Sequence, residues 1–174
     1  MPFGSITKAM TMMRVYPVSL VCLGVAIACQ PSSSQLTESH RSAIEDSVRQ
    51  FLTEFADQTS TGDLTALIPY YANESGFHWM ENGALSYPSY DSVTATLRRI
   101  APTIAESRFE FEELRVVALA PGTASLSMLF RQFFTDTSGF AFDFGGAMTL
   151  IAVHRDDGWK FISGHVSEPV QSGR

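Results

Sequence analysis

Thiols and cationic side chains are scarce in this chain. Its 174 residues include two cysteines, Cys22 and Cys29, so everything after residue 29 lacks a thiol and cannot form a disulfide. The folded part must therefore be stabilised by its hydrophobic core. Lysine and arginine together number 12 against 18 aspartate and glutamate residues, which gives a net charge of −6. Because nucleic-acid binding needs clustered cations to neutralise phosphates, we expect no nucleic acid partner.

The sequence also lacks the spacings that mark metal and phosphate sites. A zinc site would need His78, His165 and a carboxylate to converge, and the sequence shows no tight ligand spacing. No glycine-rich phosphate loop follows a predicted strand. The pair Gly145-Gly146 lies inside a strand and indicates a bulge or a bend. We therefore expect neither a metal nor a cofactor.

The first 28 residues have the layout of a secretory signal. Lys8 and Arg14 precede an uncharged apolar run over 15–28, which ends in small residues at 26–28. The run is shorter than the roughly 20 residues of an ordinary transmembrane helix. The ending Ala-Ile-Ala-Cys resembles a bacterial lipoprotein signal, although Ala26 stands where such signals usually carry leucine.

By that resemblance, Cys29 becomes the acylated N-terminus of the mature chain. Gln30, in place of an aspartate, implies the outer membrane, with the protein facing the periplasm. An ordinary cleaved signal, giving a soluble periplasmic or secreted protein, and an uncleaved anchor stay open as alternatives. Loss of residues 1–28 removes two cations and moves the net charge from −6 to −8. An acidic chain is not drawn to anionic lipid, so we expect the acyl chains alone to hold it at the membrane.

Hydrophobic periodicity divides the remaining chain into a polar tether at 29–36, a domain at 37–169 and a tail at 170–174. The domain opens with an amphipathic helix of about six turns that ends near 59–62. Asp63 caps a short second helix, which Pro69 kinks or stops. A third helix starts near Ser89 or Asp91 and ends where Pro102 breaks its last turn. Its apolar face comprises Val93, Leu97, Ile100 and Ile104.

Strands make up the rest of the domain. Asn82-Gly83 predicts a hairpin between 77–80 and 84–87, and four longer strands are predicted at 108–119, 123–135, 140–154 and 159–167. Short connections make neighbouring long strands antiparallel. Helices followed by a strand meander indicate an α+β fold with the helices on one face of a curved sheet.

The last strand carries polar residues among core residues. Strict alternation places five of its side chains on one face: Trp159, Phe161, Ser163, His165 and Ser167. Such a face suits the wall of a pocket.

Three motifs carry a resemblance to a known family: Gly62-Asp63-Leu64, Tyr70-Tyr71-Ala72-Asn73, and Gly-Trp-Lys with Gly-His-Val-Ser on the last strand. With the order of the elements, they make residues 37–169 similar to the SnoaL-like and ketosteroid-isomerase-like branch of the nuclear transport factor 2-like superfamily. The resemblance implies a cone in which three N-terminal helices pack on a strongly curved, mostly antiparallel sheet. It also implies an apolar cavity open at one end, and pairing as a homodimer through the outer face of the sheet.

Family members include enzymes and domains that bind or assemble without chemistry, so the fold does not settle the function. Steroid-isomerase chemistry needs a carboxylate base, a hydroxyl donor and a carboxylic acid donor. Aligned on Gly62-Asp63-Leu64, these roles fall at Trp79, at Phe55, and near Ala147 or Met148, none of which can fill them. The sequence therefore argues against that reaction.

Other polar residues are the candidates for chemistry. His165, Asp143 and His78 are the catalytic candidates, as a neutral imidazole or a desolvated carboxylate can transfer protons. Two of them also have a structural alternative: His165 bonds within the core or across a subunit contact, and Asp143 lies in water or pairs with Arg131. Arg131 holds an anionic group or pairs with Asp143 or Glu112. The predicted ligand-binding set is Tyr71, Trp79, Phe130, Arg131, Phe134, His165 and Ser167.

Two functional hypotheses follow. The first is a membrane-tethered, non-catalytic domain whose aromatic-lined cavity holds a small apolar or mixed ligand or serves assembly. The alternative is an acid–base enzyme, an isomerase, lyase or hydrolase, acting on a small hydrophobic substrate.

Overall fold

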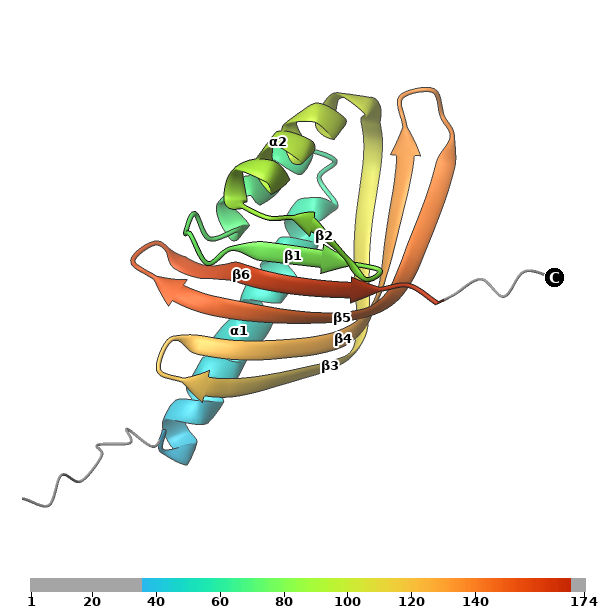
Figure 1. Ribbon diagram of the computed structural model, residues 1–174. Coiled ribbons are helices and arrows are strands. Elements are labelled where there is room, and N and C mark those ends of the chain that lie inside the picture. The colour runs from blue at the N-terminus through green and yellow to red at the C-terminus, as the bar shows by residue number, and fades with distance from the viewer. Residues whose placement is uncertain (1–35, 170–174) are drawn as a thin grey trace, which may run out of the picture. The chain divides into compact units, whose positions relative to one another are not determined.

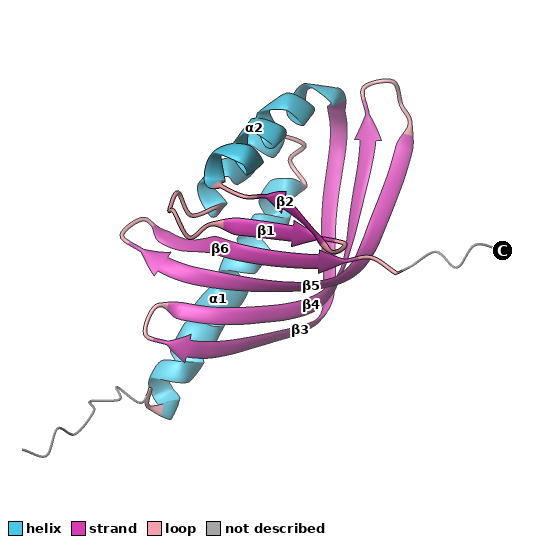
Figure 2. Cartoon of the chain, in the orientation of Figure 1, coloured by secondary structure: helices cyan, strands magenta, loops and turns pink. Residues whose placement is uncertain are grey.

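The computed structural model describes residues 36–169, so the predicted signal peptide, Cys29, most of the tether and the tail lie outside the described residues. The described residues form one compact unit with its own hydrophobic core. Figure 1 and Figure 2 show its elements in order. They are α1 (Glu38–Thr59), the 3₁₀ helix η1 (Leu64–Tyr70), β1 (His78–Glu81), β2 (Ala84–Tyr87), α2 (Tyr90–Ile100), the 3₁₀ helix η2 (Ala101–Thr103), β3 (Ile104–Ala120), β4 (Thr123–Asp136), β5 (Ala141–Arg155) and β6 (Gly158–Ser167).

The first helix forms as the sequence predicts. The Thr37 side chain accepts a hydrogen bond from the His40 amide and caps α1, whose 22 residues make about six turns. Asp63 caps the following segment through the Thr65 amide at 2.9 Å. This segment, η1, is a 3₁₀ helix rather than an α-helix, and Pro69 lies within it. The predicted second helix therefore exists in a tighter form.

The third helix differs from its prediction at one residue. Ser89 and Ser92 form a reciprocal capping box at the start of α2. The helix ends at Ile100 because Pro102 lacks the amide that an α-helix requires, and the chain continues as η2. Ile104, predicted on the apolar face of this helix, is instead the first residue of β3.

The sheet has the order β2-β1-β6-β5-β4-β3. The four long strands and the β1–β2 hairpin pair antiparallel, which confirms the predicted meander and hairpin. Asn82 and Gly83 both have positive φ, as the predicted two-residue turn requires. The parallel pairing of β1 with β6 could not be predicted from the sequence, and it makes the sheet mixed.

The strands β3, β4 and β5 run past the end of β6 and bend (Figure 1). A bulge in β3 lies at Glu113, which has a positive φ of 52°. In β5, side chains at Gly145 and Gly146 would overlap the backbone of Phe130 and Ser167. Because β5 pairs with β4 without a break here, the two glycines permit a bend and close strand approach rather than a bulge.

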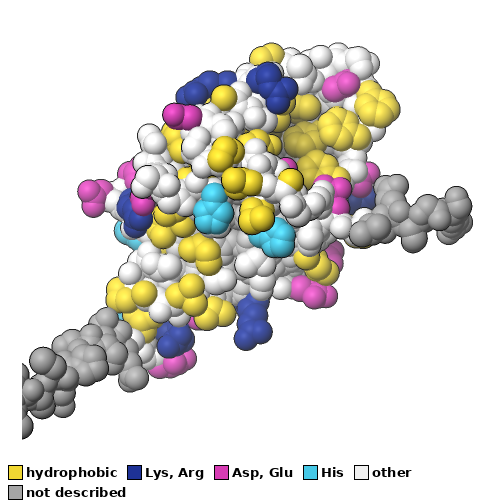
Figure 3. All heavy atoms as spheres, in the orientation of Figure 1, with side chains coloured by type: hydrophobic (Ala, Val, Ile, Leu, Met, Phe, Trp, Pro, Cys, Tyr) yellow, Lys and Arg dark blue, Asp and Glu magenta, His cyan; other side chains and the backbone are white. Residues whose placement is uncertain are grey.

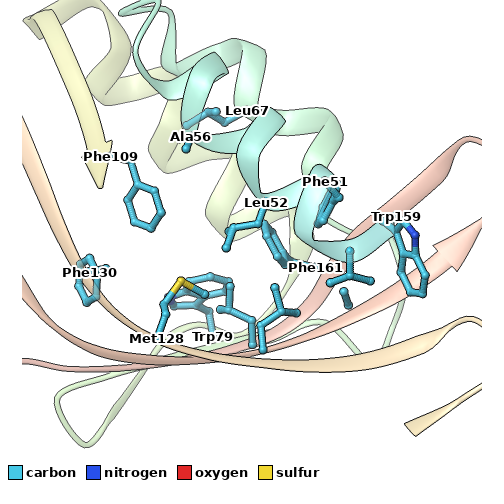
Figure 4. Packing of buried hydrophobic residues seen from close by; sticks show 14 of the residues in the cluster. Phe51, Leu52, Ala56, Leu67, Trp79, Phe109, Met128, Phe130, Trp159 and Phe161 are labelled. Carbon is cyan, nitrogen blue, oxygen red and sulfur yellow. The ribbon is translucent and has the colours of Figure 1, made fainter. Parts of the chain in front are cut away.

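The core lies between α1 and the inner face of the bent sheet. Figure 4 shows Leu52 and Ala56 of α1 facing Met128, Phe130 and other sheet side chains. Trp159 is also buried, and its indole nitrogen donates to Ser47 on α1 at 2.8 Å. The helices within residues 36–169 are too short or too polar to cross a membrane.

Candidate functional site

A cavity of about 490 Å³ lies where α1, η1 and α2 cover the inner face of the sheet. Most of its wall is apolar, and aromatic side chains form a large part of it. The aromatic lining comprises Phe55, Tyr71, Trp79, Tyr87, Phe109, Phe130, Phe134, Phe142, Phe144 and Phe161. A cavity of this size and lining is typical of sites for small organic ligands.

Phenylalanines mark the open part of the cavity. Phe142 and Phe144 belong to the inner face of β5, yet they are 41% and 37% exposed. Both contact Phe134 of β4, with ring centroids 5.4 Å and 6.1 Å apart. Figure 3 shows hydrophobic side chains gathered on this side of the molecule, between α2 and the β4–β5 hairpin. An apolar molecule can therefore reach the cavity over a phenylalanine-lined opening.

Polar groups interrupt the apolar wall at several points. Glu81 lines the cavity from the end of β1, two residues after Trp79 and on the same strand face. Burial raises the pKa of Tyr71 far above the ordinary tyrosine range, and electrostatic coupling to the Tyr87 phenol and the charge of Glu81 add to the rise. Burial and Glu81 likewise raise the pKa of Tyr87, against an opposing effect of Arg99. Two protonated phenols therefore stand near one carboxylate.

Gln132 contributes an amide from the inner face of β4, where it is 8% exposed. Its Nε2 lies 3.0 Å from Ser107 Oγ and 3.1 Å and 3.2 Å from the carbonyl oxygens of Arg108 and Phe133, and its two N–H groups are shared among these three acceptors. Since carbonyl oxygens only accept hydrogen bonds, these partners fix which side of the amide carries the nitrogen. The Oε1 atom lies on the other side and has no hydrogen bond within the described residues.

Glu168 lines the cavity just after β6 and is tied to the β1–β2 turn. Its backbone amide donates to Asn82 Oδ1 at 2.8 Å, while Asn82 Nδ2 donates to Glu168 Oε1 at 3.3 Å. The backbone N–H of Asn82 also donates to the Val166 carbonyl oxygen at 3.0 Å. The hairpin thus holds this glutamate beside the end of β1, where Glu81 also lies.

The structure brings four of the seven predicted ligand-binding residues to the cavity: Tyr71, Trp79, Phe130 and Phe134. Three of the positions matched to steroid-isomerase roles, Phe55, Trp79 and Met148, also line it. The positions that the resemblance aligned therefore lie in the cavity wall, and their side chains are apolar.

The shared face predicted for the last strand is wrong beyond Phe161. Ile151 pairs with Ser163 and Ala152 with Phe161, so Ile162 is an extra residue in β6 and the alternation reverses after it. Val166 is buried and lines the cavity, whereas His165 and Ser167 are exposed and lie on the opposite face. His165 and Ser167 are therefore not part of the cavity wall.

Arg131 and Asp143 pair with each other on the outer face of the sheet. Arg131 Nε and an Nη nitrogen lie 2.8 Å and 2.7 Å from Asp143 Oδ2. Arg131 also lies 5.0 Å from the centre of the Phe133 ring. Of the alternatives for Arg131, the structure shows pairing with Asp143, and neither residue lines the cavity.

His78 lies on the outer side of β1, away from the cavity. Its Nδ1 is 3.0 Å from the Gly76 carbonyl oxygen, which only accepts, so Nδ1 carries a proton. Its Nε2 is 3.0 Å from Ser163 Oγ. No group of three or more metal-ligating side chains forms within residues 36–169. The three catalytic candidates thus stay outside the cavity, whereas Glu81, which alternation from Trp79 could have placed there, was not among the predicted site residues.

The sequence of this chain matches a known family, and its fold is similar to those of solved structures. A model of the SnoaL-like domain family matches residues 48–171. Sequences of curated proteins give no match. Among solved structures, a nuclear transport factor 2-like superfamily protein from Salmonella enterica serovar Typhimurium has a TM-score of 0.63 at 9% identity, with 76% of this chain and 95% of that chain covered.

Two further structures are described as proposed dehydratases. The one from Streptomyces avermitilis has a TM-score of 0.63 at 16% identity and covers 75% of this chain and 99% of its own. The other, a proposed scytalone dehydratase from Novosphingobium aromaticivorans, has a TM-score of 0.60 at 12% identity, with 71% and 82% covered. At such identities these likenesses concern the fold. The chain therefore belongs to the SnoaL-like domain family, and residues 36–169 adopt the nuclear transport factor 2-like fold.

Proposed function

We propose that this domain binds a small, largely apolar molecule in its cavity without transforming it. The observation that carries the proposal is the cavity of about 490 Å³ with its aromatic wall and phenylalanine-lined opening. A domain that needed only a stable core would fill such a space, because empty apolar volume costs stability. The catalytic candidates His78, Asp143 and His165 lie outside this wall, which favours binding over catalysis.

Calorimetry with a neutral aromatic alcohol tests this function. The chain from Gln30 onward contains the whole compact unit and its core, so it is the suitable material. We expect 2-naphthylmethanol to bind saturably at one site per chain. Absence of saturable heat with this and similarly sized apolar alcohols would argue against a ligand-binding cavity.

We further propose, from the sequence, that acylated Cys29 tethers the domain to the outer membrane on the periplasmic side. The basic start, apolar run and small residues before Cys29 support this. Mass spectrometry of the N-terminal peptide from membranes should show acyl chains on Cys29, and Cys29→Ser should release the protein from the membrane fraction. An unmodified peptide beginning elsewhere would contradict the anchor.

A homodimer through the outer face of the sheet is also proposed. Leu129 is 43% exposed on β4, and Val117 and Ile151 lie partly exposed on the same face. Apolar residues on the outer as well as the inner face favour a second cover for the sheet. Light scattering should give twice the chain mass, and Leu129→Glu should give the monomer. A monomeric wild-type chain would reject this pairing.

One observation favours acid–base catalysis as a second candidate function. Glu81 faces the cavity near two phenols that stay protonated, which is a base beside two hydrogen-bond donors. Such a set can take a proton next to a ketone while a phenol donates to the developing enolate oxygen. Exchange of the acidic protons of 2-tetralone in D₂O, followed by NMR, tests this. Exchange that is accelerated by the wild type and lost in Glu81→Gln would favour the enzyme.

A further inference from the structure

The polar groups of the cavity are unbalanced in charge. Glu81 and Glu168 both line it, while no lysine, arginine or histidine among the described residues does. Arg99 of α2 acts electrostatically on Tyr87 without lining the cavity. Glu81 is partly buried, so its charge is screened less than that of Glu168, which is exposed.

The neutral polar groups include a third acceptor. Gln132 is nine-tenths buried. Two backbone carbonyl oxygens bind its Nε2, so its Oε1 lies on the other side of the amide group. The Oε1 atom is left without a partner within residues 36–169, on a side chain that lines the cavity. No buried side-chain oxygen or nitrogen within the described residues lacks a hydrogen-bond partner, so Oε1, which has none, is accessible to solvent. A ligand that donates to this oxygen takes the place of water there.

Together these groups determine which head group of a ligand the cavity binds most tightly. A carboxylate ligand would bring a third negative charge beside two glutamates and would offer no donor to Gln132. The phenols of Tyr71 and Tyr87 can donate to a carboxylate, but they donate to a hydroxyl oxygen as well. A hydroxyl group donates without adding charge. A protonated amine donates and also compensates the charge of Glu81 or Glu168. The aromatic lining suits a body of ring size.

We propose that the cavity selects molecules with an apolar ring body and a hydrogen-bond-donating head, a protonated amine best, and rejects carboxylates of the same size. This selectivity rests on the proposed binding function and assigns its ligand class. Glu81, Glu168 and Gln132 are the residues that determine it. Fatty acids and aromatic acids are therefore excluded by charge although they match the apolar wall.

Three compounds that share a naphthalene ring and differ in the head group test this selectivity: 2-naphthylmethylamine, 2-naphthylmethanol and 2-naphthoate. Each is titrated into the chain from Gln30 onward near neutral pH, and its affinity is measured by calorimetry. We expect the amine to bind most tightly and the carboxylate most weakly. If each glutamate strengthens amine binding about tenfold, the amine exceeds the uncharged alcohol by about 100-fold, and the carboxylate, which both glutamates repel, falls below the alcohol. In Glu81→Gln the amine should lose about tenfold in affinity while the alcohol changes by less than about twofold.

The matched control is Glu112→Gln, which removes an exposed carboxylate from β3 outside the cavity and should leave all three affinities unchanged. This control separates a local effect from the overall negative charge of the chain. Equal affinity for amine and carboxylate, or an amine preference that survives in the Glu81→Gln, Glu168→Gln double variant, overturns the proposed selectivity while alcohol binding still supports the cavity function. Binding of none of the probes overturns both.

Discussion

The six-membered ring of Trp79 lies against the α-carbon of Gly164, its partner across the parallel β1–β6 pair. A Cβ at Gly164 would overlap this ring, so glycine is required for the tryptophan to lie in the cavity wall. We expect Gly164→Ala to reduce the free energy of unfolding by about 1–3 kcal/mol, because the ring and the strand must shift to make room. Urea unfolding measures this change.

Gly76→Ala is the matched control for this substitution. A Cβ there would meet only Ile162 Cδ1, at 3.7 Å, an ordinary van der Waals distance. Its free energy of unfolding should change by less than about 1 kcal/mol. Equal effects of the two substitutions would show that Trp79 does not lie against Gly164.

The phenols of Tyr71 and Tyr87 should ionise late in an alkaline titration. Their pKa values are raised by burial and by the nearby charge of Glu81. Neutral phenols in the fold contribute stability below the ordinary tyrosine pKa, and this contribution is lost as the pH rises through the raised values. Phenolate absorbance should show a late phase that Tyr71→Phe reduces and Glu81→Gln moves to lower pH. A late phase unmoved by Glu81→Gln would place this carboxylate away from the phenols.

Asp136 should stabilise the β4–β5 turn in a pH-dependent way. Its Oδ1 accepts from Ser138 Oγ at 2.6 Å and from the amides of Ser138 and Phe140 at 2.8 Å and 3.0 Å. These bonds, the Ser138 hydroxyl first, lower the pKa of Asp136. The contribution is present above the ordinary carboxyl pKa and is lost as the pH falls below it through the lowered value. Carboxyl NMR should report the low pKa, and Asp136→Asn should abolish this part of the acid dependence.

The side-chain alternation of β6 reverses at Ile162, and from this we predict which substitutions change ligand affinity. His165→Ala should leave binding of 2-naphthylmethanol unchanged, because this side chain lies on the face away from the cavity. Met148→Ala should weaken binding several-fold through lost contacts with the ligand, since Met148 lines the wall. If His165→Ala weakens binding as much as Met148→Ala, the assignment of faces along β6 is wrong.

The sequence predicted the element order because its local signals are strong. Thr37, Asp63 and Ser89 stand at the starts of the helices, and Asn82-Gly83 gives a two-residue turn. The aromatic wall was also predictable, since the motif resemblance fixed the position of Trp79 relative to the cavity. These features depend on few residues that are close in the chain.

The polar part of the site could not be predicted in the same way. A single extra residue, Ile162, moved His165 and Ser167 to the other face, and such a bulge leaves no mark in a strand of apolar and small residues. The pairing of Arg131 with Asp143 was one of several possibilities left open by the sequence. It depends on the β4–β5 register, which the sequence does not fix. Glu81 and Gln132 acquire their roles through the covering helices and the parallel β1–β6 pair, which are tertiary contacts.

Ligand binding in the cavity underlies the proposed function and the proposed selectivity. Thr96 lines it from α2 and is partly buried, so Thr96→Trp should fill the space, whereas Thr53→Trp makes the same change on the exposed side of α1. The measurement is calorimetric binding of 2-naphthylmethanol to both folded variants. We predict that Thr53→Trp binds as the wild type does and that Thr96→Trp loses binding. Equal binding by the two variants would contradict the cavity as the ligand site.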